Sequence, residues 1–133
     1  MNREICYYLS ECKAKDIVLL EISSSCDQEF YVKLVSNTDA TTECLYYEAT
    51  KPAESSSGIK QLVYHYFEYL YGENLRLEIY SNARLAYSES FGSIMDSHGN
   101  NVGFSYNIFC EDGRGGDQDY NDIIISVKTW RGE

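Results

Sequence analysis

The segment from Phe109 to Trp130, FCEDGRGGDQDYNDIIISVKTW, joins an acidic, glycine-rich stretch to a β-branched run. Residues 111–122 carry five carboxylates against a single cation, Arg114, which gives a local net charge of −4. Carboxylates held close together repel one another by about 1 kcal/mol per pair even in water. The run that follows places Ile123, Ile125 and Val127 on one face, a spacing typical of a strand rather than a helix. The sequence therefore predicts an acidic turn that leads directly into a β-strand.

The polar residues of this turn predict a site for a hard divalent cation. They are Glu111, Asp112, Asp117, Asp119, Asn121 and Asp122. Calcium binds roughly six to eight oxygen atoms at about 2.3–2.6 Å, and a tight turn with alternating polar side chains supplies such a set. An EF-hand is excluded, because counting from Asp117 its required glycine falls on Asp122 and its required glutamate on Lys128.

Alternation of apolar and polar residues along the rest of the chain predicts an antiparallel β-sandwich of about nine strands. Strand patterns occupy residues 4–9, 16–23, 29–35, 43–49, 74–80, 84–90, 91–96, 102–110 and 123–130. Residues 59–71, IKQLVYHYFEYLY, fit helical and strand spacing alike, and their aromatic density favours a strand. With 133 residues and no internal repeat, we expect one domain over residues 1–133.

The composition restricts the classes of ligand. A net charge of −10 and an isoelectric point near 4.6 argue against nucleic acid and anionic membranes, because both require basic surfaces. Neutral molecules and cations remain as expected ligands. Thirteen tyrosines, five phenylalanines and one proline in so short a chain favour strands over helices.

The cysteines and the N-terminal residues bear on compartment. The cysteines, Cys6, Cys12, Cys26, Cys44 and Cys110, are odd in number and irregularly spaced, so we expect reduced thiols rather than a disulfide framework. The first residues lack an apolar core of signal-peptide length, and the sequence has no apolar run long enough to span a membrane. We expect a protein without membrane insertion that is cytoplasmic, or released or surface-associated without a signal peptide.

The stretch EDGRGGDQDYNDIIISVKTW resembles the C-terminal signature of small bacterial calcium-dependent lectins that bind fucose and mannose. In that family an ED-G-x-D-x-D-Y-N-D loop precedes a hydrophobic strand and a tryptophan near the chain end. Two adjacent calcium ions sit in the loop, and sugar hydroxyls ligate them directly. The resemblance, mainly over residues 109–132, implies a β-sandwich lectin that recognises neutral sugars through one or two bound calcium ions.

The resemblance also implies roles for individual residues. The metal ligands would be Glu111, Asp117, Asp119, Asn121 and Asp122, with Ser23 in the place of an asparagine on an early loop of the family. The sugar contacts would be Asp112, Gly113, Asp117, Ser24 and Ser25. The family pattern further implies a homodimer or higher homo-oligomer built around the C-terminal strand.

Three departures from the family pattern support an alternative function. Ser23 replaces the asparagine, the insertion Arg114-Gly115-Gly116 lengthens the loop by two residues, and Arg131-Gly132-Glu133 follows Trp130 where the family has a terminal glycine. All three fall where the family contacts its second ion or its sugar. The alternative is a β-sandwich module with structural calcium that mediates protein–protein interaction or self-assembly and binds no sugar.

An enzyme is the least supported class. The sequence shows no ordered Ser/His/Asp or Cys/His set. His65 and His98 have no partner at metal-ligand or triad spacing, so we interpret them as ordinary strand and turn residues. We therefore expect a binding protein without catalytic residues.

Overall fold

The computed structural model describes residues 1–25, 28–52, 60–70, 73–112 and 122–131. These residues form nine β-strands and no helix, which confirms the all-β class. The strands are β1 (Asn2–Tyr8), β2 (Ile17–Ser24), β3 (Phe30–Asn37), β4 (Glu43–Lys51), β5 (Lys60–Glu68), β6 (Glu73–Ser81), β7 (Leu85–Met95), β8 (Asn101–Asp112) and β9 (Ile123–Trp130). No described helix could cross a membrane.

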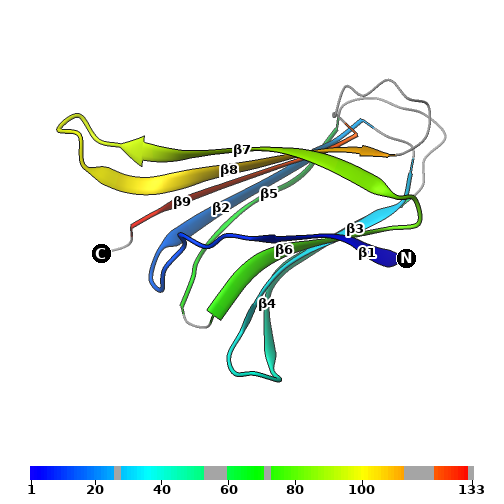
Figure 1. Ribbon diagram of the computed structural model, residues 1–133, viewed down its shortest axis with the longest axis horizontal. Coiled ribbons are helices and arrows are strands. Elements are labelled where there is room, and N and C mark those ends of the chain that lie inside the picture. Colours follow the sequence, from blue (N-terminus) through cyan, green and yellow to red (C-terminus); the bar gives the residue numbers. More distant parts are fainter. Residues whose placement is uncertain (26–27, 53–59, 71–72, 113–121, 132–133) are drawn as a thin grey trace.

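The strands form two antiparallel sheets that pack face to face, as the sandwich prediction requires (Figure 1). The first sheet, sheet A, has the order β1-β6-β3-β4. The second, sheet B, has the order β5-β2-β9-β8-β7. Because β2 and β8 flank β9, the second and the last strands of the chain share the middle of sheet B.

Two of the strand predictions have clear outcomes. Residues 60–68 form β5, so the preference for a strand over a helix is confirmed. The separate strands predicted for residues 84–90 and 91–96 are wrong, because β7 runs unbroken from Leu85 to Met95. Its ladder with β8 continues across the predicted boundary, where Ser90 pairs with Asn107 and Phe91 with Tyr106, so pairing with the neighbouring strand joins the two segments.

The core lies between the two sheets and follows the alternation expected of strands with one buried face. In β9, Ile123, Ile125 and Val127 are fully buried, and the residues between them are half-buried. The tyrosines divide between core and surface: Tyr69 and Tyr106 are buried, whereas others such as Tyr64 are exposed. Of the five cysteines, the four that the structure describes form no disulfide with one another.

Aromatic stacking closes one side of the sandwich, where the edge strands β4 and β5 meet. The Tyr46 and Phe67 rings stack with centroids 5.0 Å apart and an interplanar angle of 18°. The Tyr47 ring and the His65 imidazole stack at 4.5 Å and 28°. His65 is thus a strand residue, as expected from the sequence. Each stacked pair adds about 0.5–1.5 kcal/mol to stability beyond the burial of its surface area, so the two pairs stabilise the contact between β4 and β5.

A buried carboxylate organises the outer face of sheet A. Glu78 on β6 is 1% exposed. It accepts hydrogen bonds from the Arg76 guanidinium (2.7 Å) and the Tyr80 hydroxyl (2.7 Å), and the Lys33 ammonium lies 3.5 Å away. Burial opposes ionisation of Glu78, but these partners outweigh it and hold the pKa of Glu78 below its usual value.

The low pKa of Glu78 predicts loss of stability in acid. A carboxylate whose pKa is lower in the folded state stabilises the fold at pH above its ordinary pKa of 4.5, and this contribution disappears as the pH falls through the folded-state value. Glu78→Gln should cost about 3 kcal/mol at neutral pH, because Arg76 and Lys33 lose their charged partner. Urea unfolding of the parent protein and Glu78→Gln between pH 7 and pH 3 should show the difference in their free energies of unfolding shrinking in acid.

As a control, Glu43→Gln should change stability by less than about 1 kcal/mol, because the Glu43 side chain is 48% exposed. An equal loss at both pH values would contradict this account.

Gly103 lies where β8 and β9 approach most closely. A Cβ atom added there would lie 1.9 Å from the carbonyl oxygen of Thr129 and 2.8 Å from the Cα of Trp130. Both are backbone atoms of the partner strand, so they cannot move without breaking the ladder. Gly92 on β7 has nothing within 4 Å of the same position.

This contrast predicts opposite outcomes for two identical substitutions. Gly103→Ala should destabilise the fold by about 3 kcal/mol or more, because overpacking forces the backbone apart. Gly92→Ala should be neutral or stabilise by a few tenths of a kcal/mol, since alanine loses less conformational entropy on folding. Thermal unfolding of the two variants measures both effects. Similar melting temperatures would refute the close approach at Gly103.

Candidate functional site

The middle of sheet B brings the early serine segment to the acidic segment. In the ladders that join these strands, Ser24 of β2 pairs with Ile123 of β9, and Ile123 pairs with Cys110 of β8. Residues almost one hundred positions apart in sequence therefore meet at one end of the sheet. The ladders end here, at the two points where the acidic segment leaves β8 and enters β9.

Hydrogen bonds fasten this junction. The carbonyl oxygen of Asp122 accepts from the Ser24 hydroxyl at 2.7 Å and from the backbone N–H of Ser25 at 3.1 Å. The backbone N–H of Asp122 donates to the carbonyl of Cys110 at 3.1 Å. Asp122 is thus held between β2 and β8, so its position is set by both neighbours of β9.

The junction orders the predicted residues into rows across the sheet. Ser25, Asp122 and Glu111 follow the last paired residues of their strands and form the outermost row. Ser23 lies two residues further in on β2, in the row of Ile124 and Phe109, about 7 Å from that end. The structure therefore brings Ser25 level with the two acidic residues and places Ser23, the predicted metal ligand, two rows behind.

Glu111 is a buried carboxylate at this end of the sheet. It pairs with Ala86 of β7 and is only 6% exposed. Its neighbour Cys110 belongs to the core, so by strand alternation the Glu111 side chain lies on the opposite, outer face. An ionised carboxylate out of water requires hydrogen bonds or positive charge around it. Glu111 thus places a buried carboxylate on the outer face of sheet B where the acidic segment begins.

The remaining predicted residues lie mostly outside the described part of the chain. Gly113, Asp117, Asp119 and Asn121 fall within residues 113–121, and Asp112 is the last residue of β8. Among the described residues, no group of three or more His, Cys, Asp or Glu side chains gathers to hold a metal ion. The described residues at the junction fit calcium in chemistry, because Glu111, Asp122 and the serines offer only oxygen ligands. Calcium binding by this segment stays a prediction.

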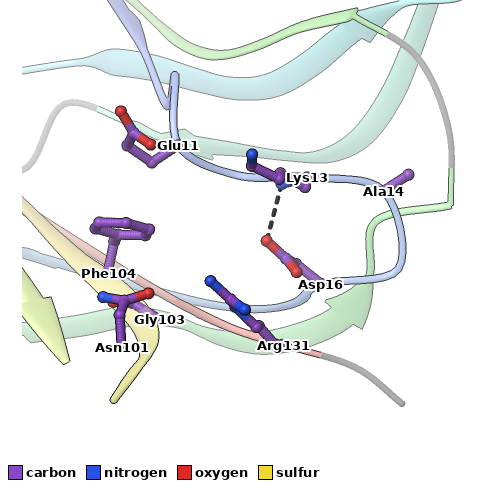
Figure 2. A pocket seen from close by; sticks show the side chains of 8 residues that line it. All are labelled: Glu11, Lys13, Ala14, Asp16, Asn101, Gly103, Phe104 and Arg131. Atoms are coloured by element: carbon purple, nitrogen blue, oxygen red, sulfur yellow. Dashed lines mark hydrogen bonds between the residues drawn. The ribbon is translucent and has the colours of Figure 1, made fainter. Parts of the chain in front are cut away.

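A separate hollow lies at the other end of the sandwich (Figure 2). Its volume is about 300 Å³, and Glu11, Lys13, Ala14, Asp16, Asn101, Gly103, Phe104 and Arg131 line it. Gly103 precedes Cys110 by seven residues on β8, so the hollow is about 24 Å from the acidic segment. The two places therefore share no residue.

Backbone hydrogen bonds shape this hollow. The N–H of Glu11 donates to the Tyr106 hydroxyl at 3.0 Å, and the N–H of Lys13 donates to the Asp16 carboxylate at 2.8 Å. The N–H of Arg131 donates to the carbonyl of Val102 at 3.0 Å. Two carboxylates and two cations line the hollow, so its net charge is zero in a chain of net charge −10. The hollow therefore differs in charge from the end of sheet B where the acidic segment begins and ends.

No pattern in the sequence indicates this hollow. Its residues come from the β1–β2 turn, the start of β8 and the residue after β9, which are three separate places in the chain. Each looks like an ordinary polar turn or strand end when taken alone. Only the pairing of β8 with β9 and the packing of the two sheets bring them together.

Solved structures with the same fold are bacterial lectins. The Chromobacterium violaceum lectin CV2L in complex with alpha-methyl-fucoside superposes with a TM-score of 0.57 at 13% identity, covering 96% of both chains. The C-terminal domain of the BC2L-C lectin from Burkholderia cenocepacia gives 0.52 at 14% identity, over 96% of this chain and 97% of that domain. The Ralstonia solanacearum high-affinity mannose-binding lectin gives 0.55 at 12% identity, again over 96% of both chains.

The chain has the fold of these lectins. The resemblance first found over residues 109–132 therefore extends, at the level of fold, over nearly the whole chain. At identities of 12–14% this likeness fixes the architecture and leaves the ligand open. No protein-family model matches the chain, and no curated protein sequence matches it.

The Ser24 hydroxyl provides a direct test of the junction. Ser24→Ala removes one of two donors to the Asp122 carbonyl, so we expect a loss of about 1 kcal/mol in the free energy of unfolding. Ser88→Ala, on the exposed side of β7, should be neutral. Chemical denaturation of both variants measures the difference. Equal stability would show that the Ser24–Asp122 contact does not form in solution.

Proposed function

We propose that this chain is a calcium-dependent lectin that binds neutral sugars such as fucose or mannose at the end of sheet B formed by the serine and acidic segments. The observation that carries the proposal is the Ser24–Asp122–Cys110 junction. It joins the serine segment to both flanks of the acidic segment, in a chain with the fold of bacterial lectins. The lectin resemblance likewise implies that the serine and acidic segments share one site.

We assign each residue a role in ion or sugar binding from its chemistry. Glu111, Asp117, Asp119, Asn121 and Asp122 would hold the ion or ions, with a serine hydroxyl of residues 23–25 nearby. Bound calcium would accept two sugar hydroxyls in place of water. Carboxylates beside it, such as Asp112, would accept the hydroxyl protons in charge-assisted hydrogen bonds. Such a site selects neutral, hydroxyl-rich ligands, which agrees with the acidic composition.

The choice of fucose or mannose follows the fold neighbours, one of which was solved with a fucoside and one of which is described as mannose-binding. The proposed protein is not an enzyme, acts without inserting into a membrane, and is a homodimer or higher homo-oligomer. Single sugar sites bind weakly, so an assembly with several sites gains avidity.

Calcium binding is tested by thermal unfolding in EDTA and in millimolar calcium. A ligand at a hundredfold excess over its dissociation constant stabilises the native state by about 2.7 kcal/mol, so the melting temperature should rise with calcium. Asp119→Asn should abolish the rise. Asp96→Asn should keep it, because Asp96 lies in the β7–β8 turn, where it accepts from the N–H groups of His98 and Asn100. An unchanged melt in the parent protein would end the calcium proposal.

Sugar binding is tested separately on a glycan array probed with the metal-loaded protein and again in EDTA. We expect calcium-dependent binding to fucosides or mannosides that Asp119→Asn eliminates. Calcium binding without any glycan signal would instead support the alternative, a β-sandwich module in which calcium is structural. Ser23 and the inserted Arg114-Gly115-Gly116 favour that alternative, because both lie where the family contacts its second ion or its sugar.

A further inference from the structure

The strand β7 is an edge strand whose two faces are both open to solvent. It is the outermost strand of sheet B and pairs with β8 alone among the described strands (Figure 1). None of its eleven residues is buried. By contrast, alternate residues of β9 in the same sheet are fully buried. The core-facing side of β7 is thus only partly covered by sheet A, where Glu4 and Tyr7 of β1 contact its first half.

Large apolar side chains occupy this partly covered side. Tyr87 and Phe91 face the same way as the core, because they pair with Cys110 and Tyr106 of β8. They are 45% and 51% exposed. The Phe91 ring stacks on the Phe104 ring at 5.6 Å and 11°, so the aromatic surface continues onto β8. With Met95, which is 52% exposed, these side chains form the β7 aromatic row.

β7 also lacks the devices that protect free edges. Exposed edge strands usually carry lysine, proline or several charges that prevent pairing with another chain. β7 has no lysine or proline, and Glu89 is its only charged residue. Glu89 is engaged, because a hydrogen bond links it to the Tyr7 hydroxyl. The edge strands β1, β4 and β5 each carry at least two charged residues, and the stacked rings described above close the β4–β5 side.

We infer that β7 pairs antiparallel with β7 of a second copy of this chain, forming a ten-stranded sheet across a twofold axis at Ser90. Full overlap of residues 85–95 places the axis at their midpoint. In that register Glu89 faces Phe91 of the other copy, not a second Glu89, so like charges do not meet. Tyr87 faces Ser93 of the other copy, whose small side chain leaves room for the tyrosine ring. The strand is therefore complementary to itself.

The size of the contact is adequate for a stable pair. Eleven residues at about 3.4 Å per residue give a strand edge about 37 Å long, which by itself is a narrow strip. The half-exposed rings of the β7 aromatic row widen it, since aromatic side chains bury about 150–250 Å² each. Because Tyr87 and Phe91 are each about half exposed, the two rings add roughly 150–250 Å² per partner to this strip, which brings the contact toward the ~800 Å² per partner of a standard protein–protein interface.

This geometry also sets where two sugar sites would lie, a consequence that rests on the proposed function. Leu85, the first residue of β7, pairs with Asp112 next to the acidic segment. In an antiparallel pair, the two acidic segments would therefore lie at opposite ends of the joined sheet, about 37 Å apart or more. A dimer of this kind would bridge two glycan-bearing surfaces rather than bind one surface twice.

The association is tested on the full chain by analytical ultracentrifugation over a dilution series, without sugar and with EDTA, so that its outcome is independent of the proposed function. We expect a dimer in the parent protein and a monomer in Phe91→Glu, which places carboxylates opposite Glu89. Adding Glu89→Lys to Phe91→Glu should restore the dimer by pairing opposite charges across the axis. The matched control Tyr66→Glu, on the other edge of sheet B and 69% exposed, should stay dimeric.

Cysteine crosslinking tests the register. Ser90→Cys places two thiols opposite each other on the axis, at the Cα separation of about 4.5–5.5 Å that a disulfide accepts. Ser88→Cys, an equally exposed control, lies opposite Gly92, so its two copies would be about 14 Å apart. Mild oxidation should link Ser90→Cys rapidly and Ser88→Cys hardly at all. Any of three results would overturn the inference. The parent protein could be monomeric, or the dimer could survive Phe91→Glu while circular dichroism shows that the variant is folded. The third result is equal crosslinking at both positions.

Discussion

The antiparallel pairing of β2 with β9 is the constraint on which the rest of this structure depends. It joins residues 17–24 to residues 123–130 across almost the whole length of the chain. Because strand side chains alternate between faces, a slip of one residue would move Ile123, Ile125 and Val127 out of the core. The same register holds Ser24 against Asp122. Core packing and the shape of the candidate site are therefore consequences of one ladder.

The two lateral sides of the sandwich differ in how their edge strands are covered and charged. On the side of β4 and β5, stacked rings bridge the sheets, and charged residues on both strands discourage pairing with another chain. On the side of β7, aromatic rings are left half-exposed on a strand with a single charge. An acidic protein repels its own copies in general, so an edge nearly free of charge is where two copies approach at least electrostatic cost.

Most of the fold could be predicted from the sequence, because strands with one buried face leave a two-residue period that is visible locally. That period located β3, β6 and β9, and aromatic content decided correctly for β5. It failed at β7, where two short strands were expected and the ladder with β8 instead continues across residues 90 and 91. The candidate site was partly predictable: the acidic segment was identified from its charge, and the serine segment was matched to it through the lectin resemblance. Ser25 lies level with Asp122 and two rows beyond Ser23, and this alignment could not be predicted because it depends on the register of the ladder.

Composition and local spacing were enough to predict the strand-rich architecture, the concentration of carboxylates between residues 111 and 122, and the net negative charge. Only the tertiary structure decided which strands are central and which are edges. It buried Glu78 beneath Arg76, Lys33 and Tyr80, and it left the β7 aromatic row partly uncovered. Whether the core-facing side of a strand is covered depends on which strand of the opposite sheet lies across from it. Local sequence patterns contain no information about that arrangement.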